Sequence, residues 1–190
     1  KKTAGRAAKG GGRLLPVPSD IPKPEAVAQL FETTRKEFGR LDLLFNNAGI
    51  AQTRPFLSIT EEDWHRVMDV NGLGVLIGMQ EAIRQFLAQG AKTGDNYSIV
   101  NISSGATRDT GMRMAPYIAS KLAVEGLTRA AAVEYGRQGI RVNTLLFGVF
   151  ETEKAKQMHA AMPAFLEKNA AKHHVGRFGG LPWRAQDKRQ

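Results

Sequence analysis

The 190-residue sequence fits one domain with a sizeable core, and its 42% hydrophobic content includes no apolar run approaching the ~18 residues of a membrane span. It has no cysteine, which excludes disulfides, thiolate metal ligands and a cysteine nucleophile, and it shows no apolar signal segment, so we expect a cytoplasmic protein. The net charge of +9 lies at the ends, with +5 in residues 1–13, +6 in residues 154–190 and −2 between them, so we favour solvated basic tails over a nucleic-acid binder.

The first elements expected are a strand and a helix. Residues 1–12 lack an apolar period and, like residues 183–190, predict a loosely ordered end. Residues 13–17 form a plausible short strand that leads into a polar turn. Pro24 can then open a helix that ends at Gly39. Its apolar positions recur with a helical period: Val27, Leu30, Phe31, Thr34 and Phe38.

A second strand at residues 41–45 runs straight into a polar turn, residues 46–49. Small residues in this turn would let the backbone approach a ligand closely, and its asparagines can tie neighbouring segments together by hydrogen bonds. We expect both roles.

A long helix is predicted from Thr60, which can cap it, to about residue 89, with an interruption near residues 71–72. Gly72, Gly74 and Gly78 resemble a dinucleotide-binding signature on paper. Because they lie inside a helix, close helix packing is the better interpretation.

The next strand, residues 99–104, ends in two hydroxyl side chains. Catalytic groups in open parallel sheets gather at the carboxyl ends of strands, so Ser104 stands where chemistry is expected. The alternative is a serine that only caps a turn. Residues 105–115 are loop-like. Five of them are candidates for the border of a substrate site: Arg108, Asp109, Met112, Arg113 and Met114.

Tyr117 and Lys121 lie one turn apart on a helix expected over residues 116–136. A nearby ammonium favours the phenolate form of a tyrosine and so suits it to general acid–base catalysis. The alternative is an ordinary surface pair. We expect the apolar sides of this helix to carry Leu122, Val124, Leu127 and Val133, and we expect the next strand at residues 140–147.

Taken together, these motifs resemble the short-chain dehydrogenase/reductase family. The resemblance rests on the turn Asn46-Asn47-Ala48-Gly49 after a strand, on Asn71, on Ser104 and on Tyr117 with Lys121, in that order. It implies an α/β fold, a Rossmann-like doubly wound parallel sheet in a single domain over residues 1–190. The family's first two strands, its glycine-rich loop and its last strand have no counterpart, so the domain is expected to be partial and truncated at both ends.

The resemblance also implies which residues act. Catalytic roles fall on Asn71, Ser104, Tyr117 and Lys121, with Asn71 supporting a water in the proton path or, alternatively, making a purely structural hydrogen bond. Asp20, just after the strand that corresponds to the family's third, would bind the adenine. The alternative is that Asp20 only starts the next helix. Phe147 replaces the family's usual proline before the segment over the nicotinamide. Cofactor binding is implied for Asp20, Ile21, Asn46, Ala48, Gly49, Tyr117, Lys121, Gly148, Phe150 and Thr152.

The implied function is an oxidoreductase that transfers a hydride between NAD or NADP and an alcohol or carbonyl substrate. A homo-oligomer is expected, without nucleic acid or membrane partners. No metal site is expected, because the adjacent His173 and His174 would point in different directions on a helix. The alternative is an inactive fragment that acts only as an association module through the helices at residues 61–89 and 116–136.

Overall fold

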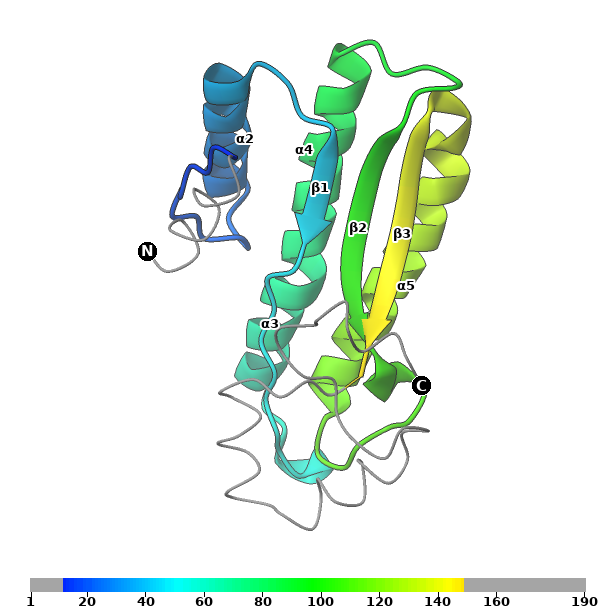
Figure 1. The fold of residues 1–190 in the computed structure, drawn as a ribbon. Coiled ribbons are helices and arrows are strands. Elements are labelled where there is room, and N and C mark those ends of the chain that lie inside the picture. The colour runs from blue at the N-terminus through cyan, green and yellow to red at the C-terminus, as the bar shows by residue number, and fades with distance from the viewer. Residues whose placement is uncertain (1–11, 149–190) are drawn as a thin grey trace, which may run out of the picture.

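The computed structural model describes residues 12–148, which form a three-stranded parallel sheet with helices packed on it (Figure 1). The strand order is β1-β2-β3, so both crossovers advance the sheet in the same direction. This is the parallel α/β arrangement that the sequence predicts. The strands are β1 (Leu43–Asn46), β2 (Tyr97–Ser104) and β3 (Ile140–Phe147).

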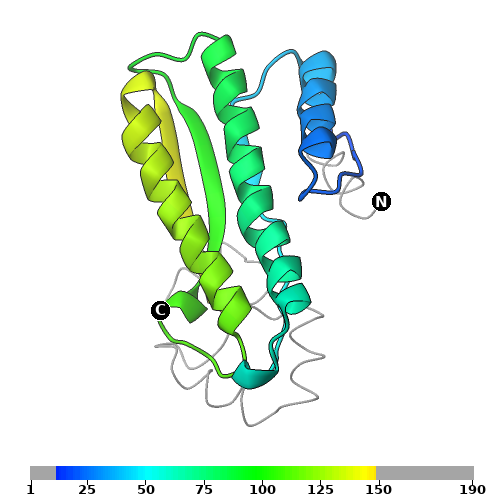
Figure 2. The ribbon, with the colours of Figure 1, turned by 180° about the vertical axis from the view of Figure 1, so that it is seen from behind.

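Helices α4 and α5 lie side by side on one face of the sheet, and α2 stands beside α4 (Figure 2). The interruption predicted in the long helix is confirmed as a π-helical turn, η2, between α3 and α4. The helices are α2 (Pro24–Phe38), α3 (Glu61–Met68), η2 (Asp69–Leu73), α4 (Gly74–Ala88) and α5 (Ala115–Tyr135).

Local signals in the sequence set the ends of these helices. Pro24 opens α2, and Gly39 ends it with a φ of 80°, a conformation that favours glycine. The Thr60 side chain accepts a hydrogen bond from the Asp63 backbone, and the Asp63 carboxylate accepts one from the Thr60 backbone. This reciprocal cap starts α3 where the sequence predicts a start.

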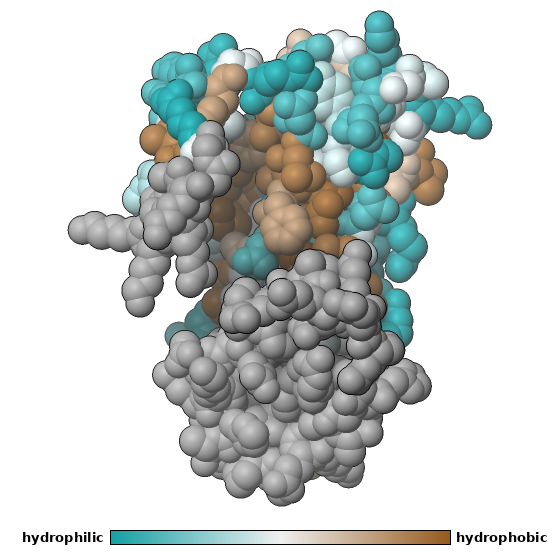
Figure 3. Space-filling model, in the orientation of Figure 1, coloured by the Kyte–Doolittle hydropathy of each residue, from teal (hydrophilic) through white to brown (hydrophobic). Residues whose placement is uncertain are grey.

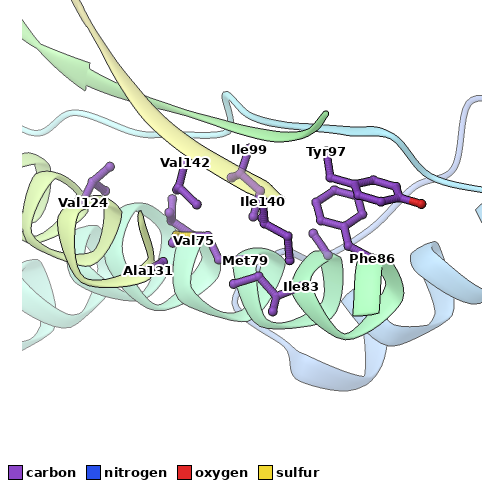
Figure 4. Packing of buried hydrophobic residues seen from close by; sticks show 11 residues of the cluster. Val75, Met79, Ile83, Phe86, Tyr97, Ile99, Val124, Ala131, Ile140 and Val142 are labelled. Carbon is purple, nitrogen blue, oxygen red and sulfur yellow. The ribbon is translucent and has the colours of Figure 1, made fainter. Parts of the chain in front are cut away.

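The hydrophobic core lies between the sheet and the α4–α5 layer (Figure 4). Phe86 of α4 is fully buried and stacks on Tyr97 at the start of β2, with 4.8 Å between ring centroids. Ile99, Ile140 and Val142 supply the strand side of this core. Packing against these side chains fixes which face of each helix points inward.

The opposite face of the sheet exposes apolar side chains from β1 and β3. Leu43 and Phe45 alternate with residues that face the helices, and Leu145 and Phe147 lie on the same outer face, since they pair in register with the outward residues of β2. Figure 3 shows hydrophobic atoms gathered over the middle of the sheet on this side.

Three predictions about elements are wrong in detail. Residues 13–17 are not a strand, because they pair with no strand within residues 12–148; instead the Arg13 guanidinium bonds the Glu37 carboxylate at the end of α2. The starts of two strands also differ: the strand predicted at residues 41–45 begins two residues later, and the strand predicted at residues 99–104 begins two residues earlier. The Leu41 backbone N–H and C=O bond the Gln89 side chain at 2.8 and 2.7 Å instead of a neighbouring strand.

The third concerns α5. Val124 is buried and Leu127 packs against the core, but the side chains of Leu122 and Val133 are 44% and 86% exposed. A helix lying on a sheet buries one stripe only, and these two residues fall outside it. None of the helices within residues 12–148 is long and apolar enough to cross a membrane. The predicted loose ends, apart from Gly12, and His173 and His174 lie outside the described residues.

Candidate active site

The carboxyl ends of all three strands meet at one edge of the sheet, next to the start of α5 (Figure 1). β1 runs into the turn that ends at Gly49, β2 ends at Ser104, and β3 is followed by Gly148. Ser104 pairs in register with Phe147, and a Cβ on Gly105 would lie 3.4 Å from the Phe147 carbonyl oxygen. This is the edge at which open parallel sheets bind ligands.

Tyr117 and Lys121 project from the first turns of α5 toward this edge. Tyr117 is half-buried, and Lys121 is 4% exposed with its Nζ 5.9 Å from the centroid of the Tyr117 ring. Lys121 Nζ donates a hydrogen bond of 2.8 Å to the carbonyl oxygen of Ile102, two residues before Ser104. The tyrosine–lysine pair is therefore tied to the strand that carries the serine.

Lys121 is buried beside the turn that follows β1. Burial disfavours the ammonium and lowers the pKa of Lys121 below its ordinary value. A Cβ on Gly49 would lie 3.4 Å from Lys121 Nζ and 3.3 Å from Asn71 Oδ1. The glycine therefore allows the turn to approach both side chains closely.

Asn71 is fully buried in the π-helical turn and links three segments. Its Oδ1 accepts a hydrogen bond from the Ile50 N–H at 2.8 Å, and its Nδ2 donates to the Ile50 carbonyl and to Ser120 Oγ, both at 2.9 Å. Ser120 Oγ in turn donates to the Tyr117 carbonyl at 2.7 Å. These contacts match the structural alternative predicted for Asn71.

Ser104 ends β2 and starts the short turn η3 (Gly105–Thr107). Its Oγ accepts a hydrogen bond of 3.2 Å from the Ala106 N–H, so the turn-capping alternative also holds. A hydroxyl has one hydrogen and two acceptor positions. Capping therefore leaves the Ser104 hydroxyl able to donate to a bound oxygen.

The other residues predicted to hold a cofactor differ in their surroundings. Ile21 and Ala48 line an apolar groove between α2, β1 and α4 together with Asn47, whereas Asp20 is exposed and pairs with Lys23 at 3.3 Å. Asn46 also borders this groove, but its Nδ2 bonds Asn101 Oδ1 at 2.8 Å between two strands. Phe150 and Thr152 lie outside the described residues.

The glycines of α4 serve close packing, as the sequence predicts. A Cβ on Gly74 would lie 2.6 Å from Ile21 Cγ2, and one on Gly78 would lie 2.8 Å from Asn46 Oδ1. These distances are shorter than side chains tolerate. The two glycines therefore let α4 lie against the groove and against β1.

Sequence reasoning missed the polar residues behind Ser104. Ser103 and Glu125 are both buried, and Ser103 Oγ donates a hydrogen bond of 2.9 Å to Glu125 Oε1. Asn101 bonds Thr128 of α5 at 2.9 Å. The signals were a glutamate one turn after Lys121 in an apolar stretch and the alternation that turns residues 101 and 103 toward α5.

Comparison with known proteins places the chain in a family. A family model described as enoyl-(acyl carrier protein) reductase matches residues 1–182. The chain is 35% identical over 150 residues to a 2-dehydro-3-deoxy-D-gluconate 5-dehydrogenase of Escherichia coli, covering 79% of this chain and 58% of that protein. It is 36% identical over 152 residues to 3beta-hydroxysteroid dehydrogenase 1 of Eggerthella lenta, covering 80% and 57%.

The structure is also similar to a solved one. A gluconate 5-dehydrogenase from Burkholderia cenocepacia, in complex with NADP and tartrate, superposes with a TM-score of 0.82 at 30% identity, covering 94% of this chain and 68% of that one. The chain thus spans less than two thirds of the length of the curated relatives above, whose names differ in substrate. The chain belongs to the short-chain dehydrogenase/reductase family.

Proposed function

We propose that this chain carries the catalytic centre of an NAD- or NADP-dependent oxidoreductase that interconverts an alcohol and a carbonyl compound. The observation that carries the proposal is the bond from Lys121 Nζ to the Ile102 carbonyl. It connects the helix that bears Tyr117 to the strand that ends at Ser104. Family membership supports the reaction class.

The residues at this edge fit a dinucleotide. The apolar groove beside Ile21 and Ala48 suits a flat ring, and Gly49 and Gly148 present bare backbone near Lys121 and Ser104. Lys121 would also hold the nicotinamide ribose, as the family resemblance implies. Its ammonium has three N–H donors, and the Ile102 carbonyl accepts from one of them, which leaves donors for the ribose hydroxyls. When bound, the nicotinamide supplies or accepts the hydride. NADP in the related gluconate dehydrogenase supports this fit.

In reduction, Tyr117 gives a proton to the substrate oxygen. Ser104 donates a hydrogen bond to the same oxygen as negative charge develops there, a preorganised contact that contributes roughly 3 kcal/mol per donor. The Lys121 ammonium, 5.9 Å from the centroid of the Tyr117 ring, lies beside the side chain that gives up the proton. Asn71 takes the structural role in this proposal: its side chain holds Ile50 and Ser120 in place.

The substitution Tyr117→Phe tests the proposal. We expect turnover of NADP⁺ with D-gluconate, a 3β-hydroxysteroid or a simple secondary alcohol to fall by at least about 100-fold, the size of a general acid–base contribution. NADPH affinity, measured by nicotinamide fluorescence, should change little, because only the hydroxyl is removed. Tyr135→Phe, at the far end of the same helix, is the matched control. Turnover within a few-fold of the unmodified chain would refute the role of Tyr117.

We propose in addition that the chain self-associates through the helices at residues 61–89 and 116–136, whether or not it is catalytically active. The observation in favour is the apolar surface left on these helices, where Leu122 and Val133 of α5 and Leu73 of η2 are exposed. Sedimentation of Leu122→Glu/Val133→Glu should show a smaller species than the unmodified chain, while Phe45→Glu, on the opposite sheet face, should not. Association without NADPH binding at high cofactor would favour the inactive association module over the enzyme.

A further inference from the structure

We propose that Glu125 is a positioning residue that, with Arg108, fixes Ser104 relative to Tyr117; this inference rests on the proposed function. Glu125 lies one turn after Lys121 on α5, so it shares a rigid helix with Tyr117. Its side chain reaches the segment that carries Ser104.

The Glu125 carboxylate accepts hydrogen bonds from residues on both sides of Ser104. Glu125 Oε1 accepts a hydrogen bond from Ser103 Oγ at 2.9 Å, immediately before Ser104. Glu125 Oε2 accepts one from Arg108 Nη2 at 2.7 Å, four residues after it. Ser103 Oγ also lies 3.3 Å from the carbonyl oxygen of Lys121, so its single hydrogen is shared between two acceptors on α5.

The segment between these two anchors is closed by its own hydrogen bonds. Thr107 Oγ1 donates to the Ser104 carbonyl at 2.8 Å, and the N–H groups of Arg108 and Asp109 donate to the Gly105 carbonyl at 2.9 and 3.0 Å. These bonds hold residues 104–109 together in one turn. Its anchors to Glu125 then set where the Ser104 hydroxyl stands relative to the phenol on α5.

The Glu125 carboxylate is buried and therefore needs these partners. The Glu125 side chain is 5% exposed, and a buried carboxylate that loses its partners is costly. Burial raises the pKa of Glu125, but the nearby Thr107, Ser103 and Arg108 side chains together outweigh this and leave the pKa below its ordinary value. Glu125 is therefore ionised, and fully able to accept both bonds, at neutral pH.

The test combines two measurements on the full chain and on Glu125→Gln, Arg108→Met and the double variant. Amide hydrogen exchange is followed at Ala106, Arg108 and Asp109, with the amides of β3 as an internal reference. Steady-state kinetics use NADP⁺ and D-gluconate as probes. Glu32→Gln, which breaks an exposed ion pair with Arg35 on α2, is the matched control.

We expect each single variant to raise exchange at the three turn amides by about tenfold, with the β3 amides unchanged. We expect kcat to fall by about 10- to 100-fold, since small misplacement of a catalytic group costs this much, with KM for NADP⁺ within about twofold. The double variant should lose no more than the larger single loss, because both residues act through one contact.

The two measurements separate the possible failures. Unchanged exchange at the turn amides overturns the positioning role whatever the activity. Faster exchange spread equally over β3 also overturns it, since Glu125 would then only stabilise the domain. If the unmodified chain does not turn over D-gluconate, the proposed function fails for that substrate, and the exchange measurement alone decides the role of Glu125.

Discussion

Replacing Asn71 with alanine should reveal how much of the site depends on one buried amide. Asn71→Ala removes three hydrogen bonds, two to Ile50 and one to Ser120. Each is worth about 1 kcal/mol net, and alanine returns up to ~0.7 kcal/mol through its better helix propensity. We therefore expect the free energy of unfolding to fall by about 2–3 kcal/mol.

Urea unfolding followed by far-UV circular dichroism measures this loss. With a urea dependence of about 2 kcal/mol per molar, the midpoint should drop by about 1 M or more. The matched control is Asn96→Ala. Asn96 is exposed and accepts one hydrogen bond, from Arg141 Nε at 2.8 Å, so its removal should cost under about 1 kcal/mol.

The same substitution should weaken NADPH binding, because Ile50 follows directly on Gly49 and loses both its backbone partners on Asn71. If Asn71→Ala and Asn96→Ala unfold at the same urea concentration, the amide is not the link between the turn, the π-helical segment and α5. The structural account of Asn71 would then be wrong.

Two further predictions concern packing and pH. Gly126→Ala should stabilise the protein by about 0.5–1 kcal/mol, because alanine has the higher helix propensity and nothing lies within 4 Å of the new Cβ. Gly78→Ala forces a Cβ to 2.8 Å from Asn46 Oδ1, and this close contact should cost about 1–3 kcal/mol, partly offset by the same gain in helix propensity; equal thermal shifts of the two variants would contradict this. Burial lowers the pKa of Lys121, so the unfolded chain binds more protons than the folded one in the pH interval between that lowered value and 10.5. Stability should therefore rise with pH in that interval, and Lys121→Met should remove this rise; a parallel pH dependence in both proteins would count against it.

Much of the site could be predicted because its signals are local. Tyr117 and Lys121 are four residues apart and so share a face of any helix that contains them. Ser104 ends a short buried strand that the apolar residues before it indicate. The helix break at residues 71–72 and the capping of α3 at Thr60 were visible for the same reason. Each depends on residues within one or two turns of each other.

The predictions that were wrong or absent all depend on contacts between segments far apart in the sequence. Residues 13–17 have the composition of a strand, but a strand exists only where another strand pairs with it. Leu122 and Val133 are apolar residues of an apolar helix, and only the docking of α5 on the sheet decides that they lie outside its buried stripe. Glu125 stands out as a charged residue in an apolar stretch, but only the packing of α5 against β2 and the turn after it decides that Ser103 and Arg108 are its partners.

The sequence by itself determined the order of elements and the ends of most helices and strands, because these follow from short-range periodicity and residue type. The residues proposed for the proton chemistry came from the resemblance to the family. The tertiary structure alone decided which of them meet. Lys121 bonds the Ile102 carbonyl, Asn71 bonds Ile50, and Glu125 bonds Ser103. These contacts form because parallel strands bring their carboxyl ends to one edge of the sheet, and because helix packing sets the distance between the helices and that edge.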